Sequence, residues 1–147
     1  MQTKIALCAS ISFYKHLNEI KHQLIKMGYQ VISSPLAEKM EAEHNYNIQD
    51  HLKSFYGQNP NKRRGEVIKQ LLHELTKVDQ ILVINLTKHG MAGYIGGNVL
   101  MEMGLAFHYN IPIFLLNPIT DDAPFKVEID AMQPTVINSD LTQLLHK

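Results

Sequence analysis

The sequence of 147 residues has a single cysteine, no tryptophan and no excess of charge of either sign. The lone Cys8 excludes an intrachain disulfide framework and a cysteine-rich zinc site. Basic and acidic residues number 14 each, so no surplus of cations is available to a nucleic-acid polymer or a membrane surface. No apolar run approaches the roughly 18 residues of a transmembrane helix, and the apolar part of the opening MQTKIALCAS is too short for a signal peptide. We therefore expect a cytoplasmic protein without nucleic-acid or membrane partners.

What is present is the composition of a globular protein. The chain is 45% hydrophobic and 19% charged, which excludes a disordered or collagen-like chain. Its length is close to that of one domain and long enough for a core that needs no disulfides. We expect a single domain spanning residues 1–147.

Apolar runs alternate with helical patterns along the chain. Five short apolar runs predict strands: Lys4–Ala9, Tyr29–Ser33, Gln80–Leu86, part of Pro112–Asn117, and Thr135–Ile137. Amphipathic or capped segments between them predict helices: Tyr14–Met27, Gly65–Lys77, Val99–Tyr109, part of Asp121–Met132, and a last helix from Ser139 or Asp140 to Leu145. This alternation predicts an α/β fold, a flavodoxin- or Rossmann-like three-layer sandwich with a parallel five-stranded sheet.

Residues 36–61 are the stretch with the weakest pattern. They are polar and charged, and they are compatible with one exposed helix, a mobile flap, or both in succession. A connection of this length without structure is unusual unless it covers a site, so we treat it as a flap or insertion. Ligands of such sheets bind beyond the carboxyl ends of the strands, which directs attention to the loops Ser10–Tyr14, Thr87–Gly97 and Asn117–Pro124.

The strongest local signal is GYIGGNVLMEMGLA, residues 93–106, which runs from a strand through glycines into a helix. Gly93, Gly96 and Gly97 would let backbone amides approach an anion, and Asn98 would cap the helix. The spacing fits neither G-x-G-x-x-G nor a Walker loop. The segment is therefore either a ligand-binding loop or a flexible strand-to-helix connection.

Glu102 is the most informative carboxylate because it stands about one turn into that helix. The helix dipole would hold its pKa low and keep it ionised. An ionised carboxylate beside a ligand crevice can attack a sugar carbon or stabilise an oxocarbenium ion. The alternative is a glutamate that merely compensates the helix dipole.

Three further features leave alternatives open. Asn85, at the end of the central strand, can bond the edge of a base or cap the strand. The basic run Lys62–Arg64 is either a solvated helix start or a phosphate clamp. The eight histidines show no spacing typical of a metal site, and Cys8 has the position of a buried apolar residue, so we expect no metal.

Three segments, KIALCASISFYKH, VDQILVINLT and EMGLAFHYNIPIFLL, resemble the nucleoside 2-deoxyribosyltransferase superfamily, which also contains nucleoside 5'-monophosphate N-glycosidases. Most specific is the last segment, which is similar to the family's glutamate-bearing helix and the strand that follows it. The resemblance covers roughly residues 4–33 and 66–118.

The resemblance implies a flavodoxin-like fold, a homodimer or larger homo-oligomer, and a nucleoside or nucleotide as the small-molecule partner. A glutamate in that family attacks C1' of the deoxyribose, which makes Glu102 the nucleophile candidate. Ser10 and Ile11 match the turn that contacts sugar or phosphate, and Tyr14 and Lys15 are added from their location beside it. The chemistry requires no metal or redox cofactor.

The chain departs from the family at two positions. An acidic residue precedes the nucleophile by six positions in the transferases, where this chain has Gly96, and an Asp of the preceding helix is replaced by Leu71. Protonation of the leaving base would then fall to Asn98, His89 or Asp122. A non-catalytic nucleotide-binding or sensor module is the alternative that these departures favour.

Two other families fit less well. The P-G-G-x-G-T-x-x-E motif of lysine-decarboxylase-like phosphoribohydrolases is not met, because Asn98 and Val99 follow the glycine pair. A flavin-binding flavodoxin is disfavoured by the lack of tryptophan and of a Ser/Thr-rich first loop.

Overall fold

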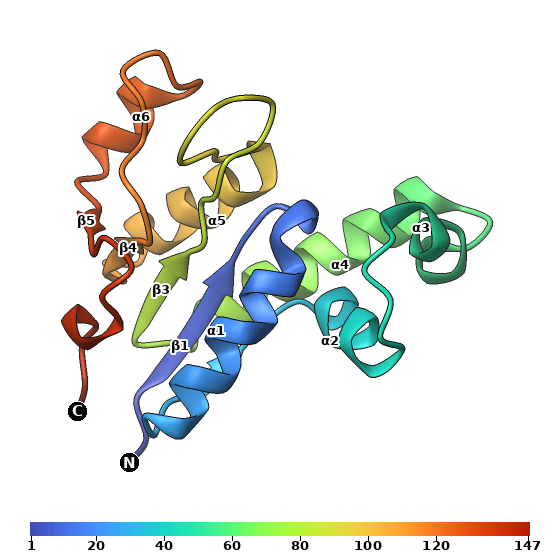
Figure 1. Ribbon diagram of the computed structural model, residues 1–147, viewed down its shortest axis with the longest axis horizontal. Helices are drawn as coiled ribbons and strands as arrows, with labels where there is room; N and C mark the ends of the chain where they lie inside the picture. Colours follow the sequence, from blue (N-terminus) through green and yellow to red (C-terminus); the bar gives the residue numbers. More distant parts are fainter.

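A five-stranded sheet with the order β2-β1-β3-β4-β5 forms the centre of the computed structural model, which describes residues 1–147 (Figure 1). The strands are β1 (Lys4–Cys8), β2 (Gln30–Ile32), β3 (Gln80–Val83), β4 (Ile113–Leu115) and β5 (Thr135–Val136). All four neighbouring pairs are parallel. This confirms the predicted α/β sandwich and its parallel five-stranded sheet, in the strand order of flavodoxin-like folds.

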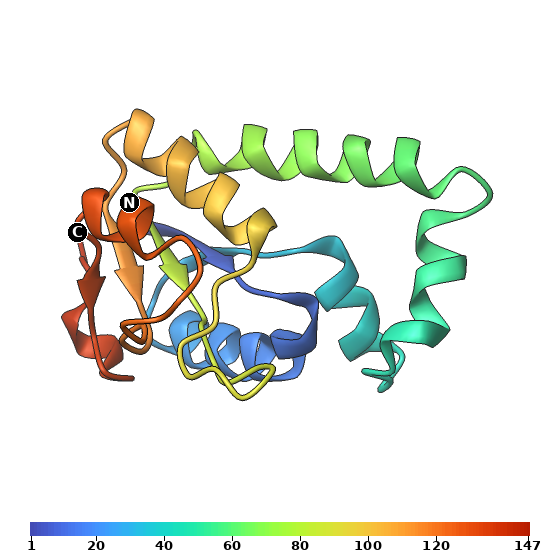
Figure 2. The ribbon, with the colours of Figure 1, turned by 90° about the horizontal axis from the view of Figure 1, so that it is seen from above.

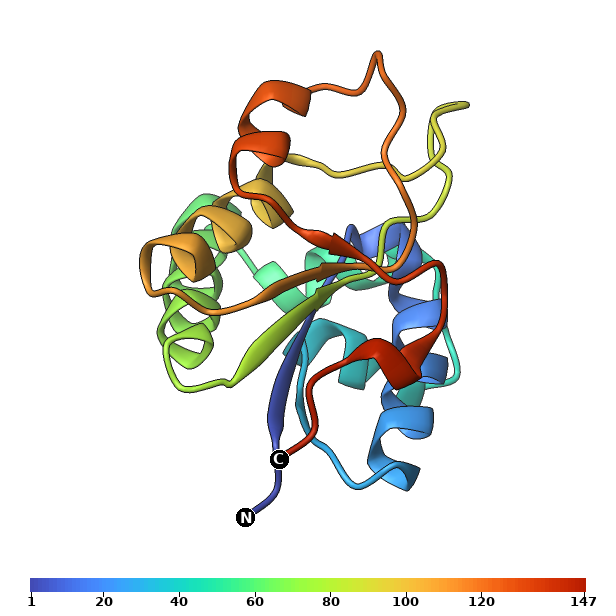
Figure 3. The same ribbon diagram turned by 90° about the vertical axis from the view of Figure 1, so that its left-hand side faces the viewer.

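Helices cover both faces of the sheet (Figures 2 and 3). One face is covered by α1 (Tyr14–Lys26), which follows the 3₁₀ turn η1 (Ile11–Phe13). The helix α2 (Pro35–Ala42) packs against α1. The other face is covered by α4 (Pro60–Leu75), α5 (Gly97–His108) and the short α6 (Lys126–Ala131). None of these helices is long and apolar enough to cross a bilayer.

The side chains of β1 show how the sheet separates two apolar cores. Ile5 and Leu7 point into the core beneath α1, whereas Ala6 and Cys8 point into the core beneath α4 and α5. Successive side chains of a strand face opposite sides, so a strand that is covered on both faces must be apolar throughout. The same alternation continues along β3 and β4.

The segment 36–61 contains two helices, α2 and α3 (Ile48–Tyr56), joined by a short connection. Figure 1 shows α3 at the far end of α4, away from the sheet. The helices α2, α3 and α4 each begin after a capping residue, which is Ser34, Asn47 and Asn59 in that order. The side chain of each capping residue accepts a hydrogen bond from a backbone amide of the first turn. Buried His51 fixes α3 to the preceding turn, because its Nε2 donates to the carbonyl oxygen of Asn45 at 2.7 Å.

The largest differences from the predicted helix boundaries occur in two places. The helix expected from Gly65 begins five residues earlier, because Asn59 caps it and Pro60 occupies its first position, where a missing amide hydrogen has no cost. The last helix expected up to Leu145 is only the 3₁₀ turn η2 (Leu141–Gln143), capped by Asp140. The strands are one to three residues shorter than the apolar runs that predicted them.

Candidate functional site

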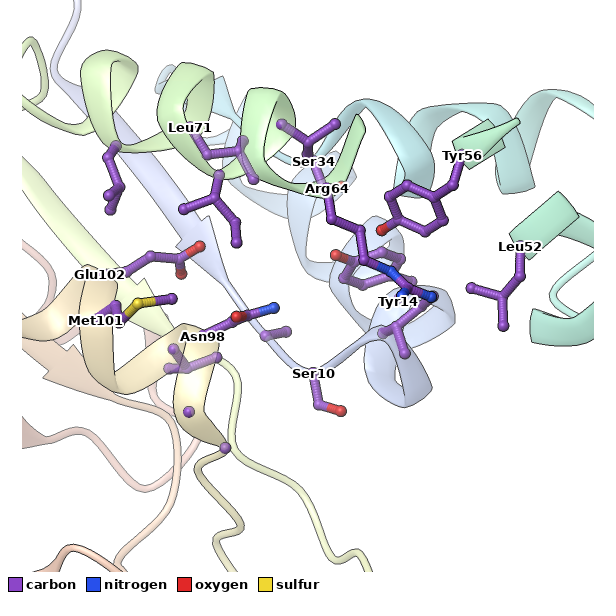
Figure 4. Close-up of a pocket in the computed structure, with 18 of the residues that line it drawn as sticks. Ser10, Tyr14, Ser34, Leu52, Tyr56, Arg64, Leu71, Asn98, Met101 and Glu102 are labelled. Carbon is purple, nitrogen blue, oxygen red and sulfur yellow. The ribbon is translucent and has the colours of Figure 1, made fainter. Parts of the chain in front are cut away.

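A cavity of about 510 Å³ lies beyond the carboxyl ends of the strands, next to β1 and β3 (Figure 4). The strand order reverses at β1, and this is where open α/β sheets bind their ligands. The lining comes from the ends of β1 and β2, from α1, α3 and α4, and from the start of α5: Ala9, Ser10, Ile11, Tyr14, Ser34, Leu52, Tyr56, Arg64, Val67, Ile68, Leu71, Leu72, Tyr94, Gly96, Gly97, Asn98, Val99, Met101 and Glu102.

Glu102 reaches into this cavity from α5 (Figure 4) and is the only carboxylate in the lining. Its Oε2 is buried and has no hydrogen-bond partner. Desolvation raises the pKa of Glu102 to about 7, while an interaction with the Cys8 thiol acts in the opposite direction.

The expectation that the helix dipole keeps the pKa of Glu102 low is therefore wrong. The dipole acts within the first turn, and Glu102 is the sixth residue of α5, which begins at Gly97. Burial between α4, α5 and β1 outweighs it.

Asn98 is also placed differently from the prediction. The cap of α5 is Gly96 with extended backbone angles, and Asn98 is the second residue of the helix. The glycine pair lets the chain enter the helix without a side-chain cap, since no such hydrogen bond is present. The side chain of Asn98 therefore does not cap the helix, and it lines the cavity.

Tyr14 stands at the start of α1 and lines the cavity opposite Glu102. Burial raises the pKa of its phenol to about 12, the negative charge of Glu102 adds to the rise, and a hydrogen bond with Ser34 lowers it. Tyr14 is therefore a neutral hydroxyl at physiological pH and a weak acid.

Ser10 occupies the turn between β1 and η1, and its Oγ accepts a hydrogen bond of 3.0 Å from Nζ of Lys88. The same ammonium group lies 5.3 Å from the centre of the Tyr94 ring. The long loop after β3 is thereby held against the turn after β1, and a cation stands beside Ser10.

Arg64 enters the cavity from α4 and stacks on the ring of Tyr56 from α3, with 4.9 Å between Cζ and the ring centroid. No carboxylate lies within ion-pair distance of it, whereas the adjacent Arg63 pairs with Glu66 at 3.7 Å. Of the basic run Lys62–Arg64, only Arg64 lines the cavity. Its guanidinium is held by an aromatic face and has its donors free.

Seven of the ten residues predicted for the site line the cavity together: Ser10, Ile11, Tyr14, Gly96, Gly97, Asn98 and Glu102. Three do not. Lys15 is exposed on α1, Asn85 is buried below the cavity, and Gly93 lies in the loop after β3. Of the proposed proton donors, Asn98 is in the lining and His89 and Asp122 are not.

Asn85 joins the ends of two strands. Its side chain donates to the carbonyl oxygens of Asn117 (2.7 Å) and Gly93 (3.3 Å) and accepts from the amide of Asn117 (3.0 Å). These bonds occupy both amide hydrogens and the oxygen atom of a side chain that is fully buried and absent from the cavity lining, so the carboxamide is not presented to a base. Of the two interpretations of Asn85, binding of a base and capping of the strand end, the structure thus supports the second.

The sequence reasoning did not single out several residues of the lining, among them Ser34, Leu52, Tyr56 and Tyr94. The pairs Ser34-Pro35 and Asn59-Pro60 are typical of helix starts, and they indicate that α2 and α4 begin there. The segment that forms α3 then lies between two helices in the sequence. Nothing in the sequence pattern indicates that Tyr56 meets Arg64. No group of three or more His, Cys, Asp or Glu side chains is arranged to hold a metal ion.

Comparisons with known proteins find a likeness among solved structures. No family model matches the chain, and no curated protein matches it. Among solved structures it is similar to a 2-deoxyribosyltransferase from the psychrotolerant bacterium Bacillus psychrosaccharolyticus, with a TM-score of 0.57 and 16% sequence identity over 85% of this chain and 80% of that one. That protein is described as a biocatalyst for the synthesis of nucleosides. At this identity the likeness concerns the fold, and the chain has the flavodoxin-like fold of a 2-deoxyribosyltransferase.

Proposed function

We propose that the protein cleaves or transfers the N-glycosidic bond of a (deoxy)nucleoside or its 5'-monophosphate through a covalent glycosyl-Glu102 intermediate. The observation that carries the proposal is the single carboxylate in the cavity, whose Oε2 is buried and lacks a partner. A buried oxygen without a partner is costly, and such groups are typical of functional sites. The shared fold and the sequence resemblance support the same assignment.

The chemistry follows from the position of Glu102. In its ionised form, one carboxylate oxygen attacks C1' as the bond to the base breaks, and the sugar becomes an ester of Glu102. Water or a second base then attacks C1' and releases the carboxylate. Hydrolysis and transfer differ only in that acceptor.

The remaining lining would bind and shield the substrate. Ser10 is suited to the sugar or its phosphate, because it lines the cavity and its hydroxyl group is held beside the ammonium group of Lys88. Gly96, Gly97 and Asn98 supply polar groups at the start of α5. In this proposal the insertion 36–61 covers the site, since α3 contributes Leu52 and Tyr56 to the lining.

We also propose that the protein assembles as a homodimer or larger homo-oligomer. The support is the presence of exposed large apolar side chains on and just after α5, namely Met101, Phe107 and Tyr109. Light scattering after size-exclusion chromatography tests this assembly, and a monomer at micromolar concentration would contradict it.

The function is tested by incubating the protein with a panel of nucleosides and 5'-monophosphates and separating the free base by chromatography. We expect base release that Glu102→Gln lowers by at least about 1,000-fold, because the amide cannot form the ester. Glu128→Gln on the exposed face of α6 is the matched control and should retain the rate. Full base release by the Glu102 variant would refute the nucleophile assignment.

One observation favours a second candidate, a non-catalytic nucleotide-binding or sensor module. The lining has no second carboxylate that could protonate a departing base. Calorimetry that detects nucleotide binding, together with no release of base from any substrate, would establish this alternative.

A further inference from the structure

The cavity offers almost no proton donor other than Glu102. Its other polar side chains are hydroxyls, one carboxamide and one guanidinium: Ser10, Ser34, Asn98, Arg64 and the phenols of Tyr14, Tyr56 and Tyr94. No histidine and no second carboxyl group is among them. Burial raises the pKa of Tyr14 to about 12, and that of the neighbouring Cys8 is also raised, so neither group gives up a proton readily.

This shortage decides which leaving groups can depart. A purine or pyrimidine leaves as an anion unless an acid protonates it, and a positioned acid is worth about 10²–10⁴-fold in rate. Glu102 cannot supply that proton while its ionised form attacks C1'. A heterocycle that already carries a positive charge on the glycosidic nitrogen needs no proton, because it leaves as a neutral molecule.

The charges of the cavity fit such a substrate. Figure 4 shows Glu102 reaching in from α5 at one end and Arg64 with Tyr56 at the other. A cationic ring next to Glu102 would favour the ionised, nucleophilic carboxylate, because opposite charges stabilise each other in a buried site. The unpaired guanidinium of Arg64 is suited to a phosphate.

We propose that the preferred substrate is a zwitterionic nucleotide, an N-ribosyl pyridinium with a 5'-phosphate, with the pyridinium near Glu102 and the phosphate at Arg64. This assignment rests on the proposed glycosidase or transferase function and specifies its substrate. The volume of about 510 Å³ lies within the usual range for small-molecule sites, about 300–1,000 Å³.

The reaction balances without an acid. The C1'–N bond breaks and its electron pair stays on the ring nitrogen, which becomes neutral. A carboxylate oxygen of Glu102 forms a bond to C1'. Water then attacks C1', the ester bond to Glu102 breaks, and the proton of the water passes to solvent. No oxidant, reductant or further reactant takes part.

The first test compares leaving groups at constant sugar and phosphate. We expect kcat/KM for nicotinamide release from nicotinamide mononucleotide to exceed that for base release from AMP, UMP and dAMP by at least about 100-fold, the lower value of a general acid. Nicotinamide adenine dinucleotide is run in parallel, since the same pyridinium could belong to a dinucleotide. In either source, release of nicotinamide must disappear in Glu102→Gln.

The second test concerns the phosphate. Arg64→Gln should lower the ratio of kcat/KM for nicotinamide mononucleotide to that for nicotinamide riboside by about tenfold or more, because a charge-assisted contact is lost. Arg63→Gln is the matched control, since Arg63 is the neighbouring residue of α4, pairs with Glu66 and is absent from the lining. An unchanged ratio in Arg64→Gln would overturn the placement of the phosphate.

The outcomes separate this inference from the function on which it rests. Glu102-dependent release of adenine or uracil at a rate equal to or above that of nicotinamide would overturn the substrate assignment and leave the glycosidase standing. No release from any compound would overturn both.

Discussion

The thiol of Cys8, the last residue of β1, interacts with the carboxyl group of Glu102 on α5. Both residues line a small inner recess of about 30 Å³ behind the main cavity. Burial keeps the thiol protonated by raising the pKa of Cys8, so a neutral S–H group stands next to the carboxyl group. The end of a central strand thus supports the charge of the group on which the proposed reaction depends.

The first prediction concerns the pH dependence of activity. Because the pKa of Glu102 is raised to about 7, the free enzyme holds the carboxylate ionised only above that pH. We expect kcat/KM for base release to rise roughly tenfold per pH unit below pH 7 and to level off above it. A stopped assay between pH 5 and 9 on a substrate without ionisable groups in that range measures this. A profile that is flat through pH 7 would contradict the raised pKa.

The second prediction is that removing the charge stabilises the protein. Glu102 has a higher pKa in the folded state than in the unfolded chain, so the folded state binds more protons between about pH 4.5 and 7, and the free energy of unfolding falls as the pH rises through that range. Glu102→Gln removes this loss. At pH 8 the free energy of unfolding of the variant should therefore exceed that of the parent by up to about 3 kcal/mol, and the variant should unfold at a higher urea concentration.

At pH 4.5 the two proteins should differ little, since the folded parent is then protonated at Glu102. Urea titrations of both proteins at the two pH values give the comparison. A Gln variant that is equally less stable at both values would show that packing of the side chain, and not its charge, dominates.

The third prediction tests Cys8 as a positioning residue. Its interaction lowers the pKa of Glu102, so Cys8→Ala should move the midpoint of the pH–activity profile to higher pH. Cys8→Ser keeps a donor in place and should restore the midpoint towards that of the parent. Both variants should lose about 1 kcal/mol of stability, because Cys8 belongs to the apolar core. Equal midpoints in all three proteins would leave Cys8 a packing residue only.

Much of the fold could be predicted because its signals are local. An apolar run such as Ile81–Ile84 predicts a strand that is buried on both sides, and alternation with helices predicts a parallel sheet. The placement of Ser10 and Gly96 at one site follows from this topology, since both end segments leave the same edge of the sheet.

What escaped prediction depends on contacts between distant segments. The contact between Tyr56 and Arg64 requires that α3 fold back against α4, and no periodicity indicates that arrangement. The raised pKa of Glu102 depends on burial, which a position within one helix does not reveal. Asn85 resembled a ligand-binding residue because its partners at Gly93 and Asn117 are joined to it only by the fold.

The last prediction separates two demands that the loop after β3 places on glycine. Gly93 and Gly90 have similar left-handed backbone angles, with φ of +67° and +70°. A Cβ at Gly93 would stand 2.1 Å from the carbonyl oxygen of Pro118, whereas a Cβ at Gly90 would meet nothing within 4 Å. Gly90→Ala should therefore cost only the backbone strain, about 1 kcal/mol.

Gly93→Ala should cost more than about 3 kcal/mol, because the backbone of one loop must move away from the other. That movement would also disturb the hydrogen bond from Asn85 to Gly93 and shift the start of α5, so base release should fall in this variant and persist in Gly90→Ala. Thermal unfolding and kcat/KM of the matched pair provide the comparison. Similar losses in both variants would mean that the loop can separate from Pro118 at no cost, and that the start of α5 is not positioned by this contact.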